Sequence, residues 1–308
     1  MPKIFIDGSA GTTGLRIAER LNERKDIELI TLPENLRKDL PSIKEAINAS
    51  DITFLCLPDE AAKEAVGLVE NSNTVIIDTS TAHRTQDGWD YGFAELTGQR
   101  EKIASSKRIA NPGCHASGFI ALVKPLTELE IIKSNAQLSC FSITGYSGGG
   151  KKMIADYESS DRSELLSSPR QYALTQNHKH LPEMAKICSL ENQPIFCPVV
   201  ADFYSGMEVT VTLFKEQADG NLSDITSAYK SYYKNGLVKY SDSFDENGFA
   251  SAGSMSGLDS MEISAFGNDE RIILVSRFDN LGKGASGAAI QNMNIVLGVD
   301  ESTGLNIR

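Results

Sequence analysis

Short apolar runs alternate with amphipathic stretches along the first 80 residues of the chain. The apolar runs are typical of strands buried on both faces of a sheet, whereas apolar positions three and four residues apart are typical of helices that cover it. The predicted elements begin with a strand and alternate with helices in the order 3–7, 15–24, 27–32, 42–49, 52–57, 59–70 and 74–80. This alternation predicts an α/β fold with a Rossmann-type, doubly wound parallel sheet.

The pattern changes after residue 113. A helical stretch at 116–129 is followed by predicted strands with long loops between them, at 136–144, 194–200, 207–214 and 271–278. Strict alternation in MEVTVTLF indicates a sheet with one open face, so we expect an α+β catalytic and oligomerisation domain with a mostly antiparallel sheet. A last helix is predicted at 284–299. The chain is therefore divided into a Rossmann domain, a catalytic domain and a C-terminal helix, at 1–113, 114–282 and 283–308.

Composition limits the function classes. The 308 residues carry a formal net charge of -11, which repels nucleic acid and anionic lipid, so we expect a small-molecule site and no nucleic-acid or membrane partner. The N-terminus lacks the pattern of a signal peptide, and no apolar stretch reaches the ~18 residues of a membrane span, so a cytoplasmic location is expected. The five cysteines include no CxxC pair, which argues against a disulfide framework and a cysteine-rich zinc site.

A glycine-rich turn, DGSAGTTG, joins the first predicted strand to the first helix. Its three glycines have GxxGxxG spacing, which lets a pyrophosphate approach the free amides at a helix N-terminus. The predicted cofactor-binding residues of this turn are Gly8, Ser9, Gly11, Thr12, Thr13 and Gly14. Alternatively, the glycines serve only to pack the helix closely on the strand.

The segment after the second predicted strand bears on the choice of cofactor. NAD enzymes usually place an acidic residue there, and Glu34 is a candidate. Arg37 and Lys38 follow within reach of a 2′-phosphate, to which Ser9 or Thr12 could add hydroxyl donors, and this favours NADP(H). As an alternative, Arg37 and Lys38 form a solvated basic pair without a ligand.

Cys114 differs in its surroundings from the other four cysteines. It follows Asn111, Pro112 and Gly113 and precedes the helix at 116–129, so it lies at or near the first turn of that helix. The unpaired amides and the helix dipole stabilise a thiolate, which can attack an acyl carbon, and the same amides can hold the resulting oxyanion. The other cysteines lie in apolar strands or on a helix face and fit small buried residues. We predict that Cys114 is a nucleophile.

Two histidines in NHKHLPEM provide a partner for the cysteine. His178 and His180 stand just before a helix that Pro182 can begin, and in an extended segment their side chains share a face. One can exchange a proton with the substrate while the other contacts an anion or orients its partner, and the sequence does not decide which; a structural role for either is the alternative. His115 adjoins Cys114 but projects in another direction, so it is the weaker base candidate. No metal site is expected, because the HxH pair has no further ligands nearby.

Taken together, these motifs resemble those of the N-acetyl-gamma-glutamyl-phosphate reductases of the shorter type, a family of arginine biosynthesis. The resemblance covers nearly the whole chain and is carried by FIDGSAGTTGLRI, DTSTAHR, NPGCHASG, GYSGGGK, HKHLPEM and DNLGKGASGAAIQNMN. It implies a relationship to the aspartate-semialdehyde and glyceraldehyde-3-phosphate dehydrogenases, in which the C-terminal helix returns to the cofactor side. It also implies a homodimer or homotetramer.

The resemblance implies a reaction as well. Cys114 displaces phosphate from N-acetylglutamyl 5-phosphate to form a thioester, NADPH reduces the thioester, and the product leaves as a semialdehyde, with the HKH segment as acid and base. The substrate-binding residues expected from it are Arg84, Asn111, Ser147, Gly148 and Gly149. Ser80 and Asn280 are expected at the cofactor, although Asn280 could instead contact the cysteine. The alternative for Arg84 is a surface loop residue.

Three other interpretations remain. GYSGGGKK nearly matches a phosphate-binding loop of ATP- or GTP-binding proteins, but Lys152 stands where Ser or Thr should hold magnesium. A non-catalytic NADP-sensing protein with an inert Cys114 would use the same parallel sheet. A related reductase acting on aspartyl phosphate or the aminoadipyl analogue would share the cysteine motif, because the shape of the pocket decides the substrate.

Overall fold

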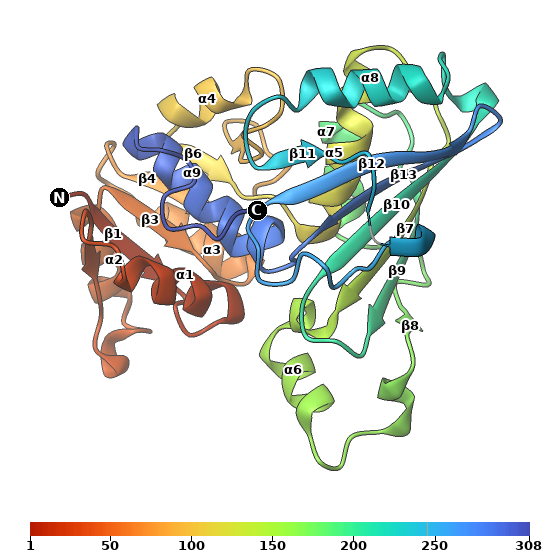
Figure 1. Cartoon of the computed structure of the whole chain (residues 1–308). Coiled ribbons are helices and arrows are strands. Elements are labelled where there is room, and N and C mark those ends of the chain that lie inside the picture. Colours follow the sequence, from red (N-terminus) through yellow and green to blue (C-terminus); the bar gives the residue numbers. More distant parts are fainter. Residues whose placement is uncertain (245) are drawn as a thin grey trace. The chain divides into compact units, whose positions relative to one another are not determined.

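The computed structural model describes residues 1–244 and 246–308, and the chain forms two compact units (Figure 1). Unit 1 contains Met1–Pro112 and Ala285–Leu305, and unit 2 contains Gly113–Gly284 and Asn306–Arg308. The chain therefore enters unit 2 at Gly113, one residue before the predicted nucleophile, and leaves it after Gly284.

Unit 1 is built on a six-stranded sheet in the order β2-β1-β3-β4-β6-β5, and all neighbouring strands are parallel. The strands are β1 (Lys3–Asp7), β2 (Glu28–Ile30), β3 (Ile52–Leu55), β4 (Val75–Asp78), β5 (Asp90–Tyr91) and β6 (Arg108–Ala110). The helices are α1 (Thr12–Asn22), α2 (Leu40–Ala49), α3 (Asp59–Gly67), α4 (Gln99–Ser105) and α9 (Gly287–Leu297). The predicted Rossmann-type sheet is confirmed. The sequence pattern missed β5 and β6, because two or three residues are too few to show a period.

Helices cover both faces of the parallel sheet because successive strand side chains point in opposite directions. On one face, Ile4 of β1 belongs to a core that includes Ile17 of α1 and Ile290 of α9. On the other, Phe5 belongs to a core that includes Ile47 of α2. The C-terminal helix thus completes the core of the unit that the N-terminus begins.

Unit 2 is built on a mixed seven-stranded sheet in the order β11-β12-β13-β10-β7-β9-β8. Its strands are β7 (Ser139–Gly145), β8 (Arg170–Gln171), β9 (Ile195–Ala201), β10 (Met207–Phe214), β11 (Val238–Tyr240), β12 (Met261–Asn268) and β13 (Arg271–Phe278). Its helices are α5 (Cys114–Glu128), α6 (Gly150–Glu158), α7 (His180–Ile187) and α8 (Leu222–Tyr232). Only the β11-β12 and β7-β9 pairs are parallel, so the prediction of a mostly antiparallel sheet is confirmed.

Helix α5 is the buried helix of unit 2, and its sequence fits that position. A β-carbon on Gly118 would lie 2.5 Å from Val209 of β10, so glycine lets the helix approach the sheet closely. Pro125 inside the helix cannot donate a hydrogen bond to the carbonyl of Ala121, but the hydroxyl of Tyr233 donates to that carbonyl at 2.8 Å. The backbone acceptor freed by the proline is therefore satisfied by a side chain from the end of α8.

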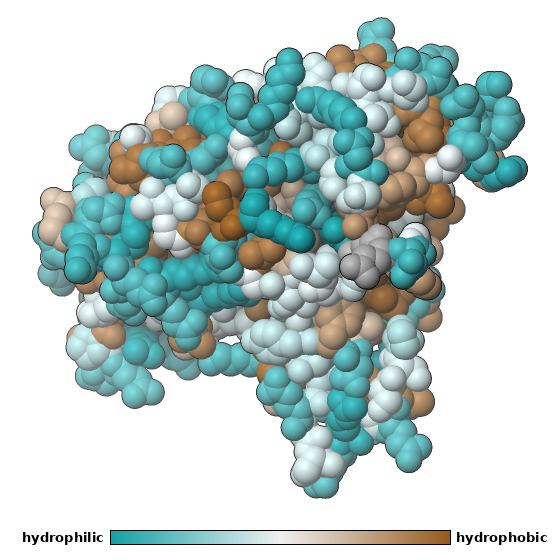
Figure 2. All heavy atoms as spheres, in the orientation of Figure 1, coloured by the Kyte–Doolittle hydropathy of each residue, from teal (hydrophilic) through white to brown (hydrophobic). Residues whose placement is uncertain are grey.

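The other face of the seven-stranded sheet carries exposed apolar side chains. Residues paired across strands point to the same face, so Ile195, Ser139, Thr212 and Ile273 form one row across β9, β7, β10 and β13. Phe141 lies in the next row, and it is exposed like Ile195 and Ile273. In Figure 2, apolar side chains show through a mainly hydrophilic surface over these strands. Such a patch is typical of a surface that contacts another protein.

Among residues 1–244 and 246–308, no helix is both long enough and apolar enough to cross a membrane.

Candidate active site

The glycine turn of unit 1 has two glycines that packing requires. Gly8 has a positive φ of 82°, and a β-carbon there would lie 2.3 Å from the carbonyl oxygen of Cys56. A β-carbon on Gly14 would lie 2.4 Å from the carbonyl oxygen of Gly8. Close packing is therefore sufficient to explain why glycine occupies these two positions of the turn.

Gly11 and Thr12 have properties that packing does not explain. A β-carbon on Gly11 would make only ordinary contacts, at 3.4 Å from the oxygen of Gly8, so space does not demand glycine there. Gly11 is the N-cap of α1, and the hydroxyl of Thr12 in the first turn is buried without a hydrogen-bond partner in the described chain. Ser9 and Thr13 of the same turn are half-buried. A donor-lined approach to a helix N-terminus fits a phosphate of a dinucleotide.

The basic pair proposed for the 2′-phosphate lies on the surface. Strand β2 is shorter than predicted because the chain turns after Ile30 and forms a short 3-10 helix at Glu34–Leu36. Arg37 and Lys38 follow this helix, and both are exposed, as is Glu34. An exposed basic pair next to the second strand is compatible with either interpretation of Arg37 and Lys38.

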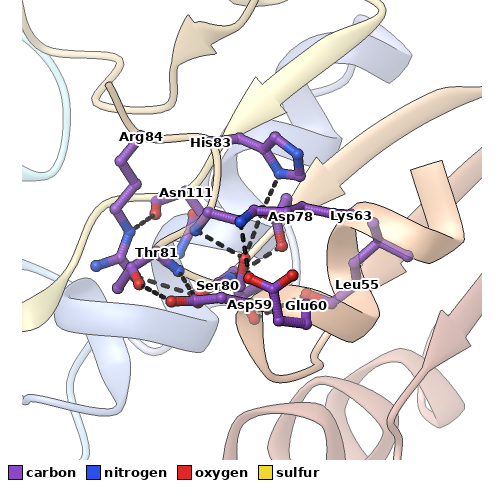
Figure 3. Close-up of polar contacts among 12 residues, drawn as sticks. Leu55, Asp59, Glu60, Lys63, Asp78, Ser80, Thr81, His83, Arg84 and Asn111 are labelled. Atoms are coloured by element: carbon purple, nitrogen blue, oxygen red, sulfur yellow. Dashed lines mark hydrogen bonds and ion pairs between the residues drawn. The ribbon is translucent and has the colours of Figure 1, made fainter. Parts of the chain in front are cut away.

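The loop after β4 is held by two buried or half-buried carboxylates (Figure 3). Asp78 accepts hydrogen bonds from the amide of Ser80 at 2.9 Å, from its hydroxyl at 2.7 Å, and from Nδ1 of His83 at 2.6 Å. Asp59 of α3 accepts from the amide and hydroxyl of Thr81. The Ser80 hydroxyl, predicted at the cofactor, therefore donates its proton within the loop and has only acceptor capacity left for a ligand.

Arg84 is nine-tenths buried, which argues against a surface-loop role. Its Nε donates to the carbonyl of Asn111 at 2.9 Å and its Nη2 to that of Thr79 at 3.0 Å (Figure 3). The side chain of Asn111 donates to the carbonyl of Ala285 and accepts from Asn292. Arg84 and Asn111, both predicted at the substrate, thus lie together at the carboxyl end of the parallel sheet.

In unit 2, Cys114 is the first residue of α5. Gly113, its N-cap, has an extended backbone, and its amide donates to Oε1 of the buried Glu183 at 2.8 Å. A β-carbon on Gly284 would lie 3.0 Å from the β-carbon of Cys114, so that glycine keeps space beside the cysteine. Because Cys114 stands in the first turn of a 15-residue helix, free amides and the helix dipole favour its thiolate.

Three of the other thiols contrast with Cys114. Burial raises the pKa of Cys56 to about 12 and raises the pKa values of Cys140 and Cys188 as well. A thiol with a raised pKa is a poor nucleophile at neutral pH. Cys197 is half-buried on the open face of the sheet.

The two histidines of the HKH segment lie beside the start of α7, with ring centroids 4.8 Å apart. The prediction of an extended segment is wrong, because Lys179 between them is helical and α7 begins at His180, two residues before Pro182. Nδ1 of His178 accepts a hydrogen bond from the amide of His180 at 3.3 Å. Burial, with a smaller contribution from the charge of Lys179, lowers the pKa of His178, so its ring is neutral at pH 7.

His115 lies in the same cluster. Its ring centroid is 6.0 Å from that of His178 and 5.5 Å from that of His180. Burial lowers the pKa of His115 to about 3. A group with so low a pKa is a weak base, which agrees with the prediction that His115 is the weaker base candidate. Since Gly113 and His115 both contact the first turn of α7, the residues on either side of Cys114 connect it to the histidine segment.

The glycine-rich segment after β7 forms a 3-10 turn at Tyr146–Gly149 and then starts α6 at Gly150. The side chain of Asn280 donates to the hydroxyl of the buried Ser147 at 3.0 Å and accepts from the amide of Gly206 at 2.9 Å. A β-carbon on Gly148 would lie 3.3 Å from the Asn280 amide nitrogen, and one on Gly149 would collide with Met153. The structure thus joins Asn280 to the predicted substrate loop.

Sequence reasoning missed Glu183, Gly284 and Tyr172. Glu183 and Gly284 lie inside the motifs HKHLPEM and DNLGKGASGAAIQNMN, so their place in these motifs could have identified them. Tyr172 follows the two-residue strand β8, and no sequence motif points to it. Within the described ranges, no three His, Cys, Asp or Glu side chains are grouped so that they could hold a metal ion.

Comparison with known proteins extends these observations. Residues 3–106 match the family model "Semialdehyde dehydrogenase, NAD binding domain", and residues 114–280 match "Semialdehyde dehydrogenase, dimerisation domain". An aspartate semialdehyde dehydrogenase structure from Francisella tularensis shares the fold with a TM-score of 0.72 at 16% identity, over 96% of this chain and 100% of that one.

Curated relatives are more similar in sequence. N-acetyl-gamma-glutamyl-phosphate reductase 2 of Nostoc sp. is 43% identical, and the alignment covers 99% of both chains. N-acetyl-gamma-glutamyl-phosphate reductase of Brucella anthropi is 45% identical over 96% of this chain and 99% of its own. The resemblance inferred from the motifs is confirmed, and unit 1 contains a nicotinamide-cofactor domain. The chain belongs to the N-acetyl-gamma-glutamyl-phosphate reductases, within the semialdehyde dehydrogenase family.

Proposed function

We propose that this chain reduces N-acetyl-gamma-glutamyl phosphate to the corresponding semialdehyde and phosphate, with NADPH as reductant and Cys114 as the residue that carries the acyl group. The observation that supports this most directly is the placement of Cys114 at the first position of α5, with both of its chain neighbours in contact with the histidine-bearing start of α7. A thiolate at a helix N-terminus beside an imidazole is an activated nucleophile.

The acyl transfer follows from these groups. The Cys114 thiolate attacks the acyl carbon, the new C–S bond forms, and the bond from carbon to the phosphate oxygen breaks so that phosphate leaves. Amides of the first turn of α5 stabilise the negative oxygen in between. When bound, the nicotinamide cofactor supplies the hydride that reduces the thioester. The former acyl oxygen is then protonated, which gives a hemithioacetal. Its later deprotonation, as the C–S bond breaks, releases the aldehyde and the Cys114 thiolate.

We assign the transfer of this proton to and from the substrate oxygen to His180 rather than to His178. Nδ1 of His178 accepts the amide hydrogen of His180 at the start of α7, and its lowered pKa keeps its ring neutral. His178 then caps and orients the segment while His180 exchanges the proton.

The residues of unit 1 fit an NADP cofactor. The buried, unpartnered hydroxyl of Thr12 and the open space at Gly11 suit a pyrophosphate, and Arg37 and Lys38 suit a 2′-phosphate. Among the other predicted residues, Arg84 and Asn111 anchor the substrate and Ser80 the cofactor, while Ser147, Gly148 and Gly149, braced by Asn280, line the acyl-phosphate site. The exposed apolar face around Phe141 joins the chain into a homodimer or homotetramer, which functions in the cytoplasm.

Two experiments test the proposal. The first follows phosphate-dependent reduction of NADP with N-acetylglutamate semialdehyde and with aspartate semialdehyde; the proposal expects preference for the former, and preference for the latter would assign the chain to aspartyl phosphate. The second measures alkylation at pH 7, in which Cys114 should react much faster than the buried Cys188, and the Cys114→Ala variant should lose turnover. Equal labelling, or activity in that variant, would refute the thioester.

A further inference from the structure

A row of three buried polar side chains runs beside the nucleophile of unit 2. Nδ1 of His115 lies 2.7 Å from the hydroxyl oxygen of Ser142, and Nε2 of His115 lies 2.7 Å from the hydroxyl oxygen of Tyr172. Ser142 is fully buried and His115 nearly so, and Phe196 packs against the imidazole at 5.3 Å between ring centroids. The proposed reaction uses none of these three groups.

Counting donors decides which nitrogen of His115 carries the proton. In the described chain, the Ser142 hydroxyl has no hydrogen-bond partner other than His115, so its buried proton is satisfied only if it is donated to Nδ1. The imidazole, which is neutral at pH 7, then carries its proton on Nε2 and donates it to Tyr172. The other tautomer would leave the serine proton buried without an acceptor, which is unfavourable.

This tautomer determines where the Tyr172 proton points. Because its oxygen accepts from His115, the hydroxyl must donate its own proton away from the imidazole. Within residues 1–244 and 246–308, His115 is the only hydrogen-bond partner of that hydroxyl. Burial raises the pKa of Tyr172, and the negative charge of a Cys114 thiolate raises it further, so the phenol stays protonated. Its hydroxyl contacts His115, the residue that directly follows the nucleophile in the first turn of α5.

We infer that the Tyr172 hydroxyl donates a hydrogen bond to the oxygen of the acyl group on Cys114, and that Ser142 and His115 are positioning residues that aim this donor through the row of hydrogen bonds between them. No proton is transferred along the row. The hydroxyl keeps its hydrogen and stabilises the negative charge that develops on the acyl oxygen. The inference rests on the proposed thioester chemistry and adds a side-chain donor to the helix amides.

A double-mutant cycle on the full-length protein tests whether the Tyr172 hydroxyl is a donor and whether His115 orients it. Tyr172→Phe should lower kcat about 100-fold, with little change in KM, as expected for one lost donor to an oxyanion. His115→Phe, which releases the hydroxyl, should cost about tenfold. In the Tyr172→Phe background, His115→Phe should not lower kcat further, because the hydroxyl that His115 orients is already absent. Tyr240→Phe is the matched control, since it removes a hydroxyl that hydrogen-bonds to Thr226, elsewhere in the described part of unit 2.

Several outcomes would overturn the inference. Losses that multiply in the double variant would show that His115 acts independently of Tyr172, and an unchanged kcat in Tyr172→Phe would remove the donor. Iodoacetamide should alkylate Cys114 at the same rate in Tyr172→Phe as in the parent chain. A parallel loss of alkylation would overturn the inference, because Tyr172 would then act on the cysteine itself and not on the acyl oxygen.

The tautomer can be measured without any substrate. The chain has four histidines, and nitrogen-15 NMR of their side chains identifies His115 as the imidazole whose signals change in Ser142→Ala. That ring should be protonated on Nε2 and unprotonated on Nδ1. His178, whose Nδ1 accepts the amide hydrogen of His180, should have the same tautomer but should not respond to Ser142→Ala. Protonation of His115 on Nδ1 would refute the inferred direction. If the parent chain does not reduce the acyl phosphate, the proposed function fails, but the NMR result still decides the direction of the row.

Discussion

The buried neutral imidazole of His115 should make the protein sensitive to acid. The pKa of His115 is lowered by burial from 6.5 to about 3, so between these values the unfolded chain binds a proton that the folded chain does not. The free energy of unfolding therefore rises with pH across this range and falls as pH is lowered. One pKa unit corresponds to about 1.4 kcal/mol, so moving from pH 7 to pH 5 should remove about 2 kcal/mol through His115 alone.

Urea unfolding at pH 7 and at pH 5, followed by circular dichroism, measures this loss in the parent chain and in His115→Phe. The variant starts less stable, because Ser142 and Tyr172 lose a partner, but its loss between the two pH values should be smaller by about 2 kcal/mol. Ser142→Ala is the matched control, since it damages the same row while keeping the titrating ring. His178 and His180, whose rings pack near that of His115, are present in every one of these proteins, so their contribution largely cancels. Equal pH dependence in His115→Phe and Ser142→Ala would refute the reasoning.

Three further predictions concern other parts of the chain. Gly14→Ala places a β-carbon 2.4 Å from a backbone oxygen and should destabilise unit 1 by about 2 kcal/mol in urea unfolding. Gly11→Ala should lower the free energy of unfolding by less than about 1 kcal/mol but raise the KM for the cofactor. Equal destabilisation by the two substitutions would contradict this prediction. The double variant Arg37→Ala/Lys38→Ala should raise the KM for NADPH about tenfold or more and leave that for NADH unchanged, and a parallel rise in both would remove the 2′-phosphate assignment. Phe141→Glu, on the open face, should shift the chain toward monomer in sedimentation velocity without unfolding it, and an unchanged mass would place the interface elsewhere.

Local patterns in the sequence were sufficient to predict the fold class and the position of Cys114 at a helix start. Long alternating runs such as MEVTVTLF and the strand-turn-helix at Gly8–Gly14 carry their own geometry, because residue period and helix start are set by neighbours in the chain. The helix start near Cys114 was predicted on the same basis, since a helix N-terminus can be inferred from the residues that precede it.

Only the tertiary structure could reveal which groups from distant parts of the chain contact the neighbours of Cys114. Glu183 contacts Gly113 across 70 positions, and the Ser142–His115–Tyr172 row joins β7, α5 and the end of β8. The extended HKH segment was predicted wrongly because α7 begins earlier than its proline suggests. The sequence determined what forms within one element, since backbone geometry is local. Tertiary packing decided which buried protons have a hydrogen-bond acceptor, since burial and hydrogen-bond partners are properties of the folded chain.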